Sequence, residues 1–411
     1  MRRAISKTLA IVIAAIIVIA GVGVVAYLAM PGGSTGGTVS IGVLLPLTGQ
    51  DAYSGQQMQQ GALMAQAYLN DNGGILGKTV KVVIKDDKSD LPTATQAATD
   101  LVTQSNVIAL AGFYKSFITT GVYQSVSTKY NILTFTAGWV DALTNPNNTL
   151  MFRAGPDEAM QITQWAQFIE MVAQKTGHTK LAMYSEDDDY GHGFQDPLAA
   201  ALQADGKVQV VFNKYHDYQA TDFTADLANV KSSGANLFWT STVSSNVMTM
   251  IKQAYTIGLS NQAVMMTVAD GFYYTSEYAT TVGTAGDHVI ITSFHKPGTN
   301  YTSLTPSMDA YYSKLGYGSQ VSYYITMQVF EDILLIADAA NKAGSTSTQS
   351  MVNALETNTF TGPWGAINFP TTANGYHQWT PSMLFEQYQS LTLKIIYPTA
   401  VAEAQMILPS G

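Results

Sequence analysis

Short apolar runs typical of β-strands alternate with helix-like stretches along most of this 411-residue chain, and this alternation limits the folds open to it. Strands that are separated by helices pair in parallel, and the resulting sheet carries helices on both faces. The runs form two series, so the pattern predicts an α/β fold with two parallel sheets, and the length also favours two lobes. The first series is Val39–Leu45, Val80–Ile84, Val107–Ala111 and Ile132–Phe135, and the second is Leu181–Tyr184, Val208–Phe212, Leu237–Trp239, Val264–Thr267 and Val289–Thr292.

Local signals predict several helix ends. Ser54 and Gln57 have the spacing of a capping box, which predicts a helix start at this point. That helix is expected to stop at Asn72-Gly73-Gly74, and Pro92 is expected to open the next one. The stretch from Pro306 to Glu356 is predicted to be mostly helical, and the C-terminal end is predicted to be β-rich and irregular.

The N-terminus predicts a membrane anchor. A short cationic end precedes an uncharged apolar stretch from Leu9 to Met30. At about 1.5 Å per residue, this stretch is long enough to cross the roughly 30 Å hydrocarbon core of a bilayer. We therefore expect a transmembrane helix over residues 1–30, with its cationic end in the cytoplasm, and a flexible Gly/Ser tether over residues 31–38. Cleavage as a signal peptide near Val24–Ala26, twin-arginine export and pilin-like processing stay open, and each leaves the body outside the cytoplasm.

The composition excludes several classes of function. The net charge is -9 and no run of Lys or Arg interrupts the body, so the electrostatic footprint of a nucleic-acid-binding protein is missing. The chain has no Cys, which rules out disulfides, thiol nucleophiles and thiolate metal sites. Its six His residues form no ligand pair at helical spacing. We therefore expect no metal and no cofactor.

Two strings resemble catalytic motifs but lie in the wrong context. Residues 32–36 have the spacing of a nucleophile elbow, which needs a strand before it and a helix after it, whereas here they fall in the tether. Residues 73–79 resemble a phosphate-binding loop but are one residue short and lead from a helix into a strand, the reverse of the required order. We therefore predict that the protein is not an enzyme.

The acidic turn Glu186–Gly191 contains three consecutive Asp residues. Adjacent side chains in an extended turn cannot all face one ion, and calcium loops use alternate positions instead. We therefore predict a solvated loop with one functional aromatic residue, rather than a cation site.

Ligands of parallel sheets bind beyond the carboxyl ends of the strands, and three residues in these loops suit a polar ligand. Tyr190 can stack on an apolar group and offer its hydroxyl, although it can also simply pack under the loop. The hydroxyl of Ser116 suits a carboxylate, and an ordinary helix cap explains it equally well. Asp270 can accept hydrogen bonds from an ammonium or cap the following helix. The loops in question are Thr48–Ser54, Gly112–Ile118, Ala137–Asp141, Glu186–Gly193, Thr240–Asn246 and Val268–Tyr274.

From about Val39 to Phe369 the sequence resembles the type I periplasmic binding proteins of the branched-chain amino acid ABC transporter family. No single string decides this resemblance, which depends on the order and spacing of several. They are IGVLLPLTGQDAYSGQQMQQGALMAQAYLNDNGGILGKTV, KVVIKDDKSDLPTATQAATDLV, DDDYGHGF, the stretch from Asp222 to Asn236, and Gly362-Pro363-Trp364-Gly365.

The resemblance implies a Venus-flytrap fold, in which two Rossmann-like lobes enclose a ligand cleft. The chain is then expected to cross between the lobes three times, near Gly155, His295 and Gly362. Lobe one is expected to comprise residues 39–154 and 296–361, and lobe two residues 155–295 and 362–411.

The family's ligand-binding positions carry over to this sequence one at a time. In the first lobe, Tyr53 matches an aromatic residue that covers the ligand. Tyr114 and Lys115 match residues that line the pocket for the ligand's side chain. Ser116 matches the hydroxyl-bearing residue that helps to hold the α-carboxylate.

The remaining expected site residues lie in the second lobe and in one loop that differs from the family's pattern. Tyr190 matches a Tyr beside the ligand, Asp270 falls where the family has the acidic partner of the α-ammonium, and Thr242 lies where another Tyr is usual. The loop after the fourth strand contains Gly138 and Trp139 where the family has small residues and Thr. Trp139 is expected to narrow the pocket, so the ligand can differ from a branched-chain amino acid.

These features predict the extracytoplasmic substrate-binding component of an ABC importer. Such a protein captures a small polar ligand, here an amino acid or a related carboxylate or amide, by lobe closure and delivers it to the permease and ATPase subunits. The alternative is a ligand-binding sensory receptor. Its signal would have to pass through a partner chain, because the only cytoplasmic part expected here, residues 1–8, is too short to be a signalling module. An extracellular hydrolase is a second rival, and it requires a nucleophile and a base that the sequence does not show.

Overall fold

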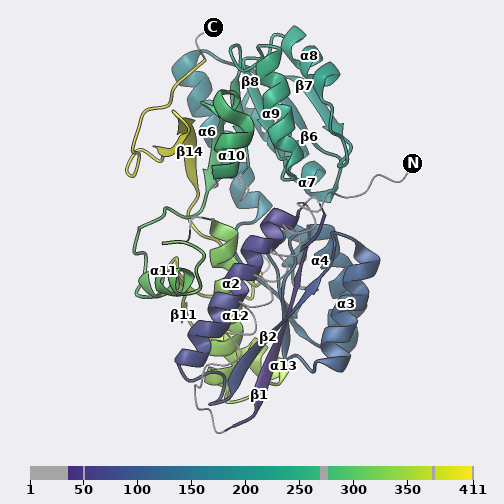
Figure 1. Cartoon of the computed structure of the whole chain (residues 1–411). Coiled ribbons are helices and arrows are strands. Elements are labelled where there is room, and N and C mark those ends of the chain that lie inside the picture. Colours follow the sequence, from purple (N-terminus) through teal and green to yellow (C-terminus); the bar gives the residue numbers. More distant parts are fainter. Residues whose placement is uncertain are drawn as a thin grey trace, which may run out of the picture.

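The computed structural model describes residues 36–49, 51–268, 276–319, 321, 323–372 and 375–409. These residues form two lobes, one above the other in Figure 1. The transmembrane helix predicted over residues 1–30 and most of the predicted tether lie outside the described residues. Within the described part, no helix is both long and apolar enough to cross a membrane.

The first lobe contains a six-stranded parallel sheet in the order β13-β5-β4-β3-β1-β2. Its strands are β1 (Thr38–Leu45), β2 (Thr79–Asp86), β3 (Ala109–Gly112), β4 (Leu133–Phe135), β5 (Met151–Ala154) and β13 (Gln378–Trp379). A two-stranded hairpin, β11 (Phe360–Thr361) and β12 (Ala366–Ile367), precedes β13. The helices of this lobe are α2 (Ala52–Asp71), α3 (Leu91–Gln104), α4 (Ser116–Val122), α5 (Thr128–Tyr130), α11 (Leu304–Lys314), α12 (Tyr324–Ala343) and α13 (Thr348–Thr357).

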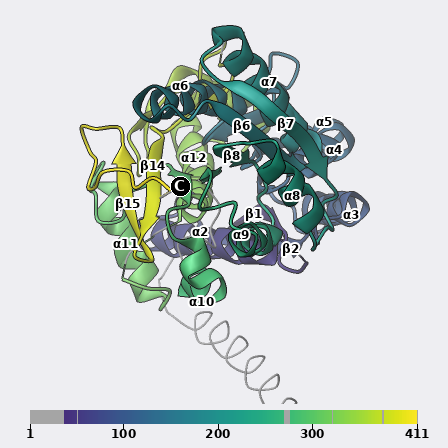
Figure 2. The same ribbon diagram turned by 90° about the horizontal axis from the view of Figure 1, so that it is seen from above.

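The second lobe contains a seven-stranded sheet in the order β15-β14-β10-β9-β8-β6-β7. In the view of Figure 2, β14 and β15 lie at one edge of this sheet and β7 lies at the other. Its strands are β6 (Lys180–Glu186), β7 (Gln209–His216), β8 (Leu237–Thr240), β9 (Val264–Thr267), β10 (Ile290–Ser293), β14 (Leu384–Gln389) and β15 (Thr392–Tyr397), of which β14 is antiparallel to both neighbours. Its helices are α6 (Glu158–Thr176), α7 (Asp189–Asp205), α8 (Thr224–Ser232), α9 (Asn246–Thr256) and α10 (Ser276–Val282).

The predicted α/β class with two mainly parallel sheets is confirmed, but the described residues 362–372 and 375–379 do not belong to the second lobe as predicted. β13 pairs with β5 of the first sheet, and the backbone N–H of Arg153 donates to the carbonyl of His377. The chain therefore enters the second-lobe sheet only after Trp379, at β14. The signal Gly362-Pro363-Trp364-Gly365 marks the turn of the β11–β12 hairpin instead of a crossing.

The start of α2 also differs from the prediction. The helix begins at Ala52, and Ser54 is buried within its first turn instead of capping it. By contrast, Pro92 lies at the start of α3 as predicted, where the side chain of Asp90 accepts a hydrogen bond from the Thr93 amide. The capping-box spacing was misleading because the residues before Ser54 already have a conformation compatible with the helix.

The first lobe depends on close packing of α2 against α12. A side chain on Gly61 of α2 would place its Cβ only 2.1 Å from the carbonyl oxygen of Thr326 on α12. Most residues of α12 are buried, which is unusual for a helix on the surface of a sheet. α12 therefore forms an inner layer that α2 covers on one side, although the two helices lie more than two hundred residues apart in the sequence.

Two acidic residues lie in this inner layer. Glu331 and Asp332 of α12 are fully buried, and neither carboxyl group has a hydrogen-bond partner among the described residues. Burial raises the pKa of both carboxyls well above the ordinary value, and the neighbouring Asp332 adds to the rise at Glu331. Burial therefore favours the neutral form of both side chains in the folded protein.

We predict that Glu331→Gln stabilises the protein at pH 8. Below the ordinary pKa of a carboxyl, Glu331 is protonated in both the folded and the unfolded state. At higher pH only the unfolded state ionises freely. The stability of the wild-type protein therefore falls as the pH rises toward the elevated native pKa. Calorimetry should show a melting temperature roughly 2 °C or more above wild type at pH 8, and a smaller difference at pH 4. The exposed change Asp205→Asn is the control, and an unchanged or lower melting temperature for Glu331→Gln at pH 8 would contradict the prediction.

Candidate functional site

A pocket lies between the carboxyl ends of the two sheets. Five of the predicted site residues line it, and three further residues, Ala137, Val243 and Tyr324, were not predicted. The loops after β3 and β4, the start of α7, the loop after β8 and the start of α12 all contribute, as the rule for parallel sheets requires. The five predicted residues are Tyr114, Lys115, Ser116, Trp139 and Tyr190.

Aromatic side chains form the walls of this pocket. The ring of Trp139, from the first lobe, lies edge-on to Tyr190 of the second lobe, with 5.5 Å between the ring centroids. It also contacts Tyr324 at 5.8 Å and Phe294 at 6.0 Å. The hydroxyl of Tyr190 is buried without a hydrogen-bond partner among the described residues. An apolar surface with one unused hydroxyl suits an aromatic or aliphatic ligand group that also carries a polar atom.

Ser116 organises the loop that carries Trp139. Its Oγ accepts hydrogen bonds from the amides of Trp139, at 3.1 Å, and Val140, at 3.3 Å. The amide of Gly138 donates to Thr136 Oγ1 at 2.9 Å. These three amides are therefore occupied within the protein, while the Ser116 hydroxyl proton can still be donated to a carboxylate. The alternative that Ser116 is only a helix cap is wrong, because its hydroxyl bonds the loop instead of the amides of α4.

Arg153 also holds the loop that carries Trp139, and the sequence analysis did not identify this residue. Its guanidinium donates to the carbonyls of Gly138, at 2.8 Å, and Val140, at 3.0 Å. It also donates to Thr144 Oγ1 and Gln378 Oε1, so it links the loop to β13. An Arg within an otherwise apolar strand is the sequence signal that could have revealed this buried, hydrogen-bonded role.

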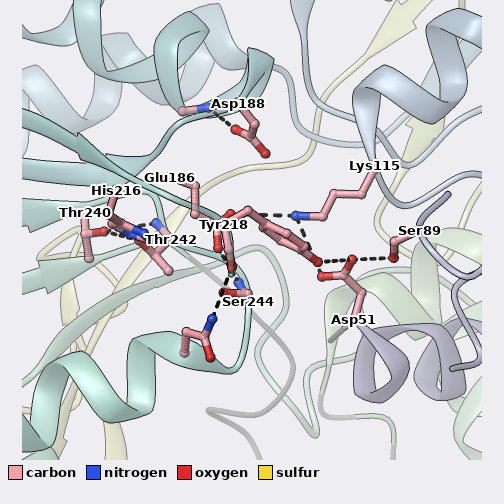
Figure 3. Close-up of polar contacts among 12 residues, drawn as sticks. Asp51, Ser89, Lys115, Glu186, Asp188, His216, Tyr218, Thr240, Thr242 and Ser244 are labelled. Atoms are coloured by element: carbon pink, nitrogen blue, oxygen red, sulfur yellow. Dashed lines mark hydrogen bonds and ion pairs between the residues drawn. The ribbon is translucent and has the colours of Figure 1, made fainter. Parts of the chain in front are cut away.

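Lys115 extends across the cleft from the first lobe to the second, as Figure 3 shows. Its Nζ lies 3.7 Å from Asp51 Oδ1 and 3.7 Å from Glu186 Oε2, and 4.5 Å from the ring centroid of Tyr218. The Tyr218 hydroxyl donates to Asp51 Oδ2 at 2.7 Å, and Ser89 donates to the same oxygen at 2.6 Å. One buried ammonium therefore joins carboxylates from both lobes.

The charges in this cluster stabilise one another. Burial alone lowers the pKa of Lys115, but the carboxylates of Asp51 and Glu186 outweigh burial and raise the pKa well above its ordinary value. Burial raises the pKa of Glu186, and the Lys115 ammonium opposes that rise. Lys115 thus remains charged, although its side chain is only 6% exposed.

The acidic turn at the end of β6 is only partly the solvated loop that was predicted. Asp187 and Asp189 are exposed, and Asp188 caps α7 by accepting a hydrogen bond from the Gly191 amide. Glu186, however, is fully buried and faces the cleft, because it is the last residue of the strand and not part of the turn. Among the described residues, no group of three or more His, Asp or Glu side chains is arranged to hold a metal ion.

The other predicted site residues do not line this pocket. Tyr53 of α2 is partly buried against the core of the second lobe, so it bridges the lobes outside the pocket. Gly138 is enclosed, since a Cβ there would approach Ser116 Oγ to 3.1 Å. Thr242 is fully buried and its hydroxyl bonds His216 and Thr240 beneath the loop. Asp270 lies outside the described residues.

Glu158, at the start of α6, joins the cleft loop to the second lobe. Its amide donates to the carbonyl of Trp139 at 3.1 Å, and its Oε2 accepts from the Asp141 amide at 3.2 Å. Its Oε1 is buried without a partner in the described structure. Burial raises the pKa of Glu158 to about 8, although the hydrogen bond from Asp141 opposes the rise. This carboxyl therefore titrates close to neutral pH beside the pocket.

The sequence matches a known protein family. A family model described as a periplasmic binding protein matches residues 38–389. An amino acid binding protein of Pseudomonas aeruginosa is 29% identical over 251 residues, which cover 60% of this chain and 63% of that protein. The Leu/Ile/Val-binding protein homolog 7 of Brucella abortus is 26% identical over 388 residues, which cover 90% of this chain and 94% of that protein.

Solved structures share the fold over nearly the whole chain. The branched-chain amino acid transporter substrate binding protein LivJ from Streptococcus pneumoniae, in complex with isoleucine, is similar with a TM-score of 0.75 and 22% identity, covering 88% of this chain and 100% of that one. A solute binding protein of an ABC transporter from R. palustris, in complex with 4-hydroxybenzoate, is similar with a TM-score of 0.73 and 19% identity. The match covers 87% of this chain and 95% of that one.

We predict that the fluorescence of Trp139 changes with a midpoint near pH 8, because Glu158 becomes charged beside its loop as the pH rises. Because the pKa is raised, the neutral carboxyl contributes stability that is fully present below the ordinary carboxyl pKa and is lost progressively as the pH rises to about 8. A fluorescence titration of wild type, Glu158→Gln and Trp139→Phe measures the effect. The transition should disappear in both variants, and its persistence in Glu158→Gln would assign it to another group.

Proposed function

The chain belongs to the periplasmic binding protein family, and we propose that it is the extracytoplasmic substrate-binding subunit of an ABC importer. Proteins of this family bind solutes and are not enzymes. The observation that supports the proposal best is the pocket itself. It is lined by side chains from both lobes, so a ligand in it would contact both at once.

The ligand we propose is an amino acid or a related carboxylate. Trp139, Tyr190 and Tyr324 offer an apolar, aromatic enclosure for the body of such a molecule. The hydroxyl proton of Ser116 is available to a carboxylate oxygen, because both its acceptor positions are already used by loop amides. The isoleucine and 4-hydroxybenzoate bound by the two similar structures are both small carboxylates, which supports this class.

We propose that the ligand acts by stabilising the closed arrangement of the lobes. Trp139 against Tyr190, and Asp51 against Tyr218, are contacts between the lobes, and we assign them to the closed arrangement. A ligand favours closure only to the extent that it binds the closed state more tightly than the open one. Closed, loaded protein is then the form that an ABC permease would accept. An N-terminal anchor, if present, would raise the effective concentration of this form at the membrane.

The proposal predicts that Ser116→Ala weakens ligand binding about tenfold or more, since it removes a buried donor to the carboxylate and releases two loop amides. Compounds that remain bound during purification would first be released and identified by mass spectrometry. Their affinity would then be measured by calorimetry.

The matched control is Ser125→Ala, because the exposed Ser125 hydroxyl donates to the carbonyl of Gly121 in the preceding turn and lies outside the pocket lining. This variant should bind as tightly as wild type. Equal affinities for Ser116→Ala and wild type would refute the proposed orientation of the ligand. Turnover of the released compound would instead show a hydrolase.

A further inference from the structure

We propose that Asp51, Lys115 and Glu186 form a second, polar subsite of the cleft, which binds a primary amide group of the ligand. This inference rests on the function proposed above and specifies its ligand class. Its basis is the meeting of three buried polar atoms that have no hydrogen-bond partner in the described structure: Asp51 Oδ1, Lys115 Nζ and Glu186 Oε2.

These atoms converge from both lobes. Lys115 Nζ lies 3.7 Å from each of the two carboxylate oxygens, beyond the range of a hydrogen bond but close enough for an ion pair. Figure 3 shows the ammonium directed toward both acidic side chains, with the ring of Tyr218 beside it. The side chains are between 0% and 6% exposed, so water does not reach these atoms from the surface.

The remaining hydrogen-bonding capacity of the subsite is well defined. Asp51 Oδ2 already accepts from Ser89 and Tyr218, and Glu186 Oε1 accepts from the Ser244 amide. Among the residues that the structure describes, each carboxylate therefore has one oxygen without a donor, and the ammonium has no acceptor within hydrogen-bond distance. Buried polar groups left in this condition cost free energy, so a molecule that supplies their partners is favoured.

A primary amide supplies the missing partners in the right number. It offers one carbonyl oxygen, which can accept from Lys115, and two N–H groups, which can donate to Asp51 and Glu186. A carboxylate has no N–H to donate and is repelled by both acidic groups. A guanidinium or ammonium has no acceptor and is repelled by Lys115. An isopropyl group of the same shape satisfies none of the three atoms.

The subsite adjoins the pocket. Lys115 is followed directly by Ser116, and both side chains line the pocket while the Lys115 ammonium extends away toward the acidic groups. A ligand with its carboxylate at Ser116 and an amide at its other end can therefore contact both places. Because Asp51 and Lys115 belong to the first lobe and Glu186 belongs to the second, such an amide would join the lobes on closure.

The experiment compares ligands of matched shape by calorimetry. Leucine, asparagine and aspartate form one series, and 4-isopropylbenzoate, 4-carbamoylbenzoate and terephthalate form another, because each series exchanges an isopropyl, an amide and a carboxylate group. In at least one series we expect the amide to bind wild-type protein about tenfold or more tightly than either analogue.

Two variants and a control complete the test. Lys115→Met keeps most of the side-chain length without the charge, and Glu186→Gln keeps the shape of the carboxylate. Both should reduce the preference for the amide over the isopropyl analogue about tenfold, whereas the exposed change Asp205→Asn should leave it unchanged.

Binding of either series to wild type without a preference for the amide would overturn this inference and leave the proposed function intact. So would a preference that survives in both subsite variants. If no compound of either series binds and none is released on purification, the function proposed above fails, and this inference fails with it.

Discussion

Parallel strand pairing is the constraint on which the rest of this structure depends. In each sheet, the pairing of neighbouring strands in the same direction brings their carboxyl ends to one edge, and the loops that follow them meet there. The two edges face each other, so Trp139 after β4 reaches Tyr190 after β6, and Lys115 after β3 reaches Glu186 at the end of β6. The pocket is thus a consequence of strand direction, and the side chains decide only what it can hold.

Two different kinds of contact join the lobes across this pocket. The aromatic contact between Trp139 and Tyr190 removes apolar surface from water and has little dependence on pH. The cluster around Lys115 is electrostatic, and it is stable only because carboxylates from both lobes compensate a buried ammonium. Separation of the lobes would take Glu186 away from Lys115 and leave the ammonium with Asp51 alone. The cleft therefore combines a non-directional contact with one that requires a specific alignment of the lobes.

Much of this arrangement could be predicted from the sequence, and the exceptions have physical causes. The strands were recognisable because buried parallel strands are continuous apolar runs, and Tyr190 was found because it follows such a run. Trp139 was singled out by its departure from the family resemblance, in a loop that also follows such a run. Asp51 and Tyr218 were missed because their roles arise from a contact between residues 167 positions apart, which no local pattern records.

The predicted lobe boundary at Gly362 was wrong for a similar reason, since only pairing with β5 reveals that β13 belongs to the first sheet. Thr242 was assigned by position alone, and its side chain is turned into the core.

The link between Arg153 and Gln378 has a consequence for how the protein is made. Arg153 lies in the first half of the chain, but the loop it supports is fully held only when β13, some two hundred residues later, has paired with β5. The packing of α2 against α12 likewise needs a segment from the last quarter of the chain. During synthesis, the first lobe therefore waits for residues that emerge from the ribosome after the whole parallel part of the second sheet. A growing chain therefore stays incompletely packed, and unable to enclose a solute, until β13 has been made and has paired with β5.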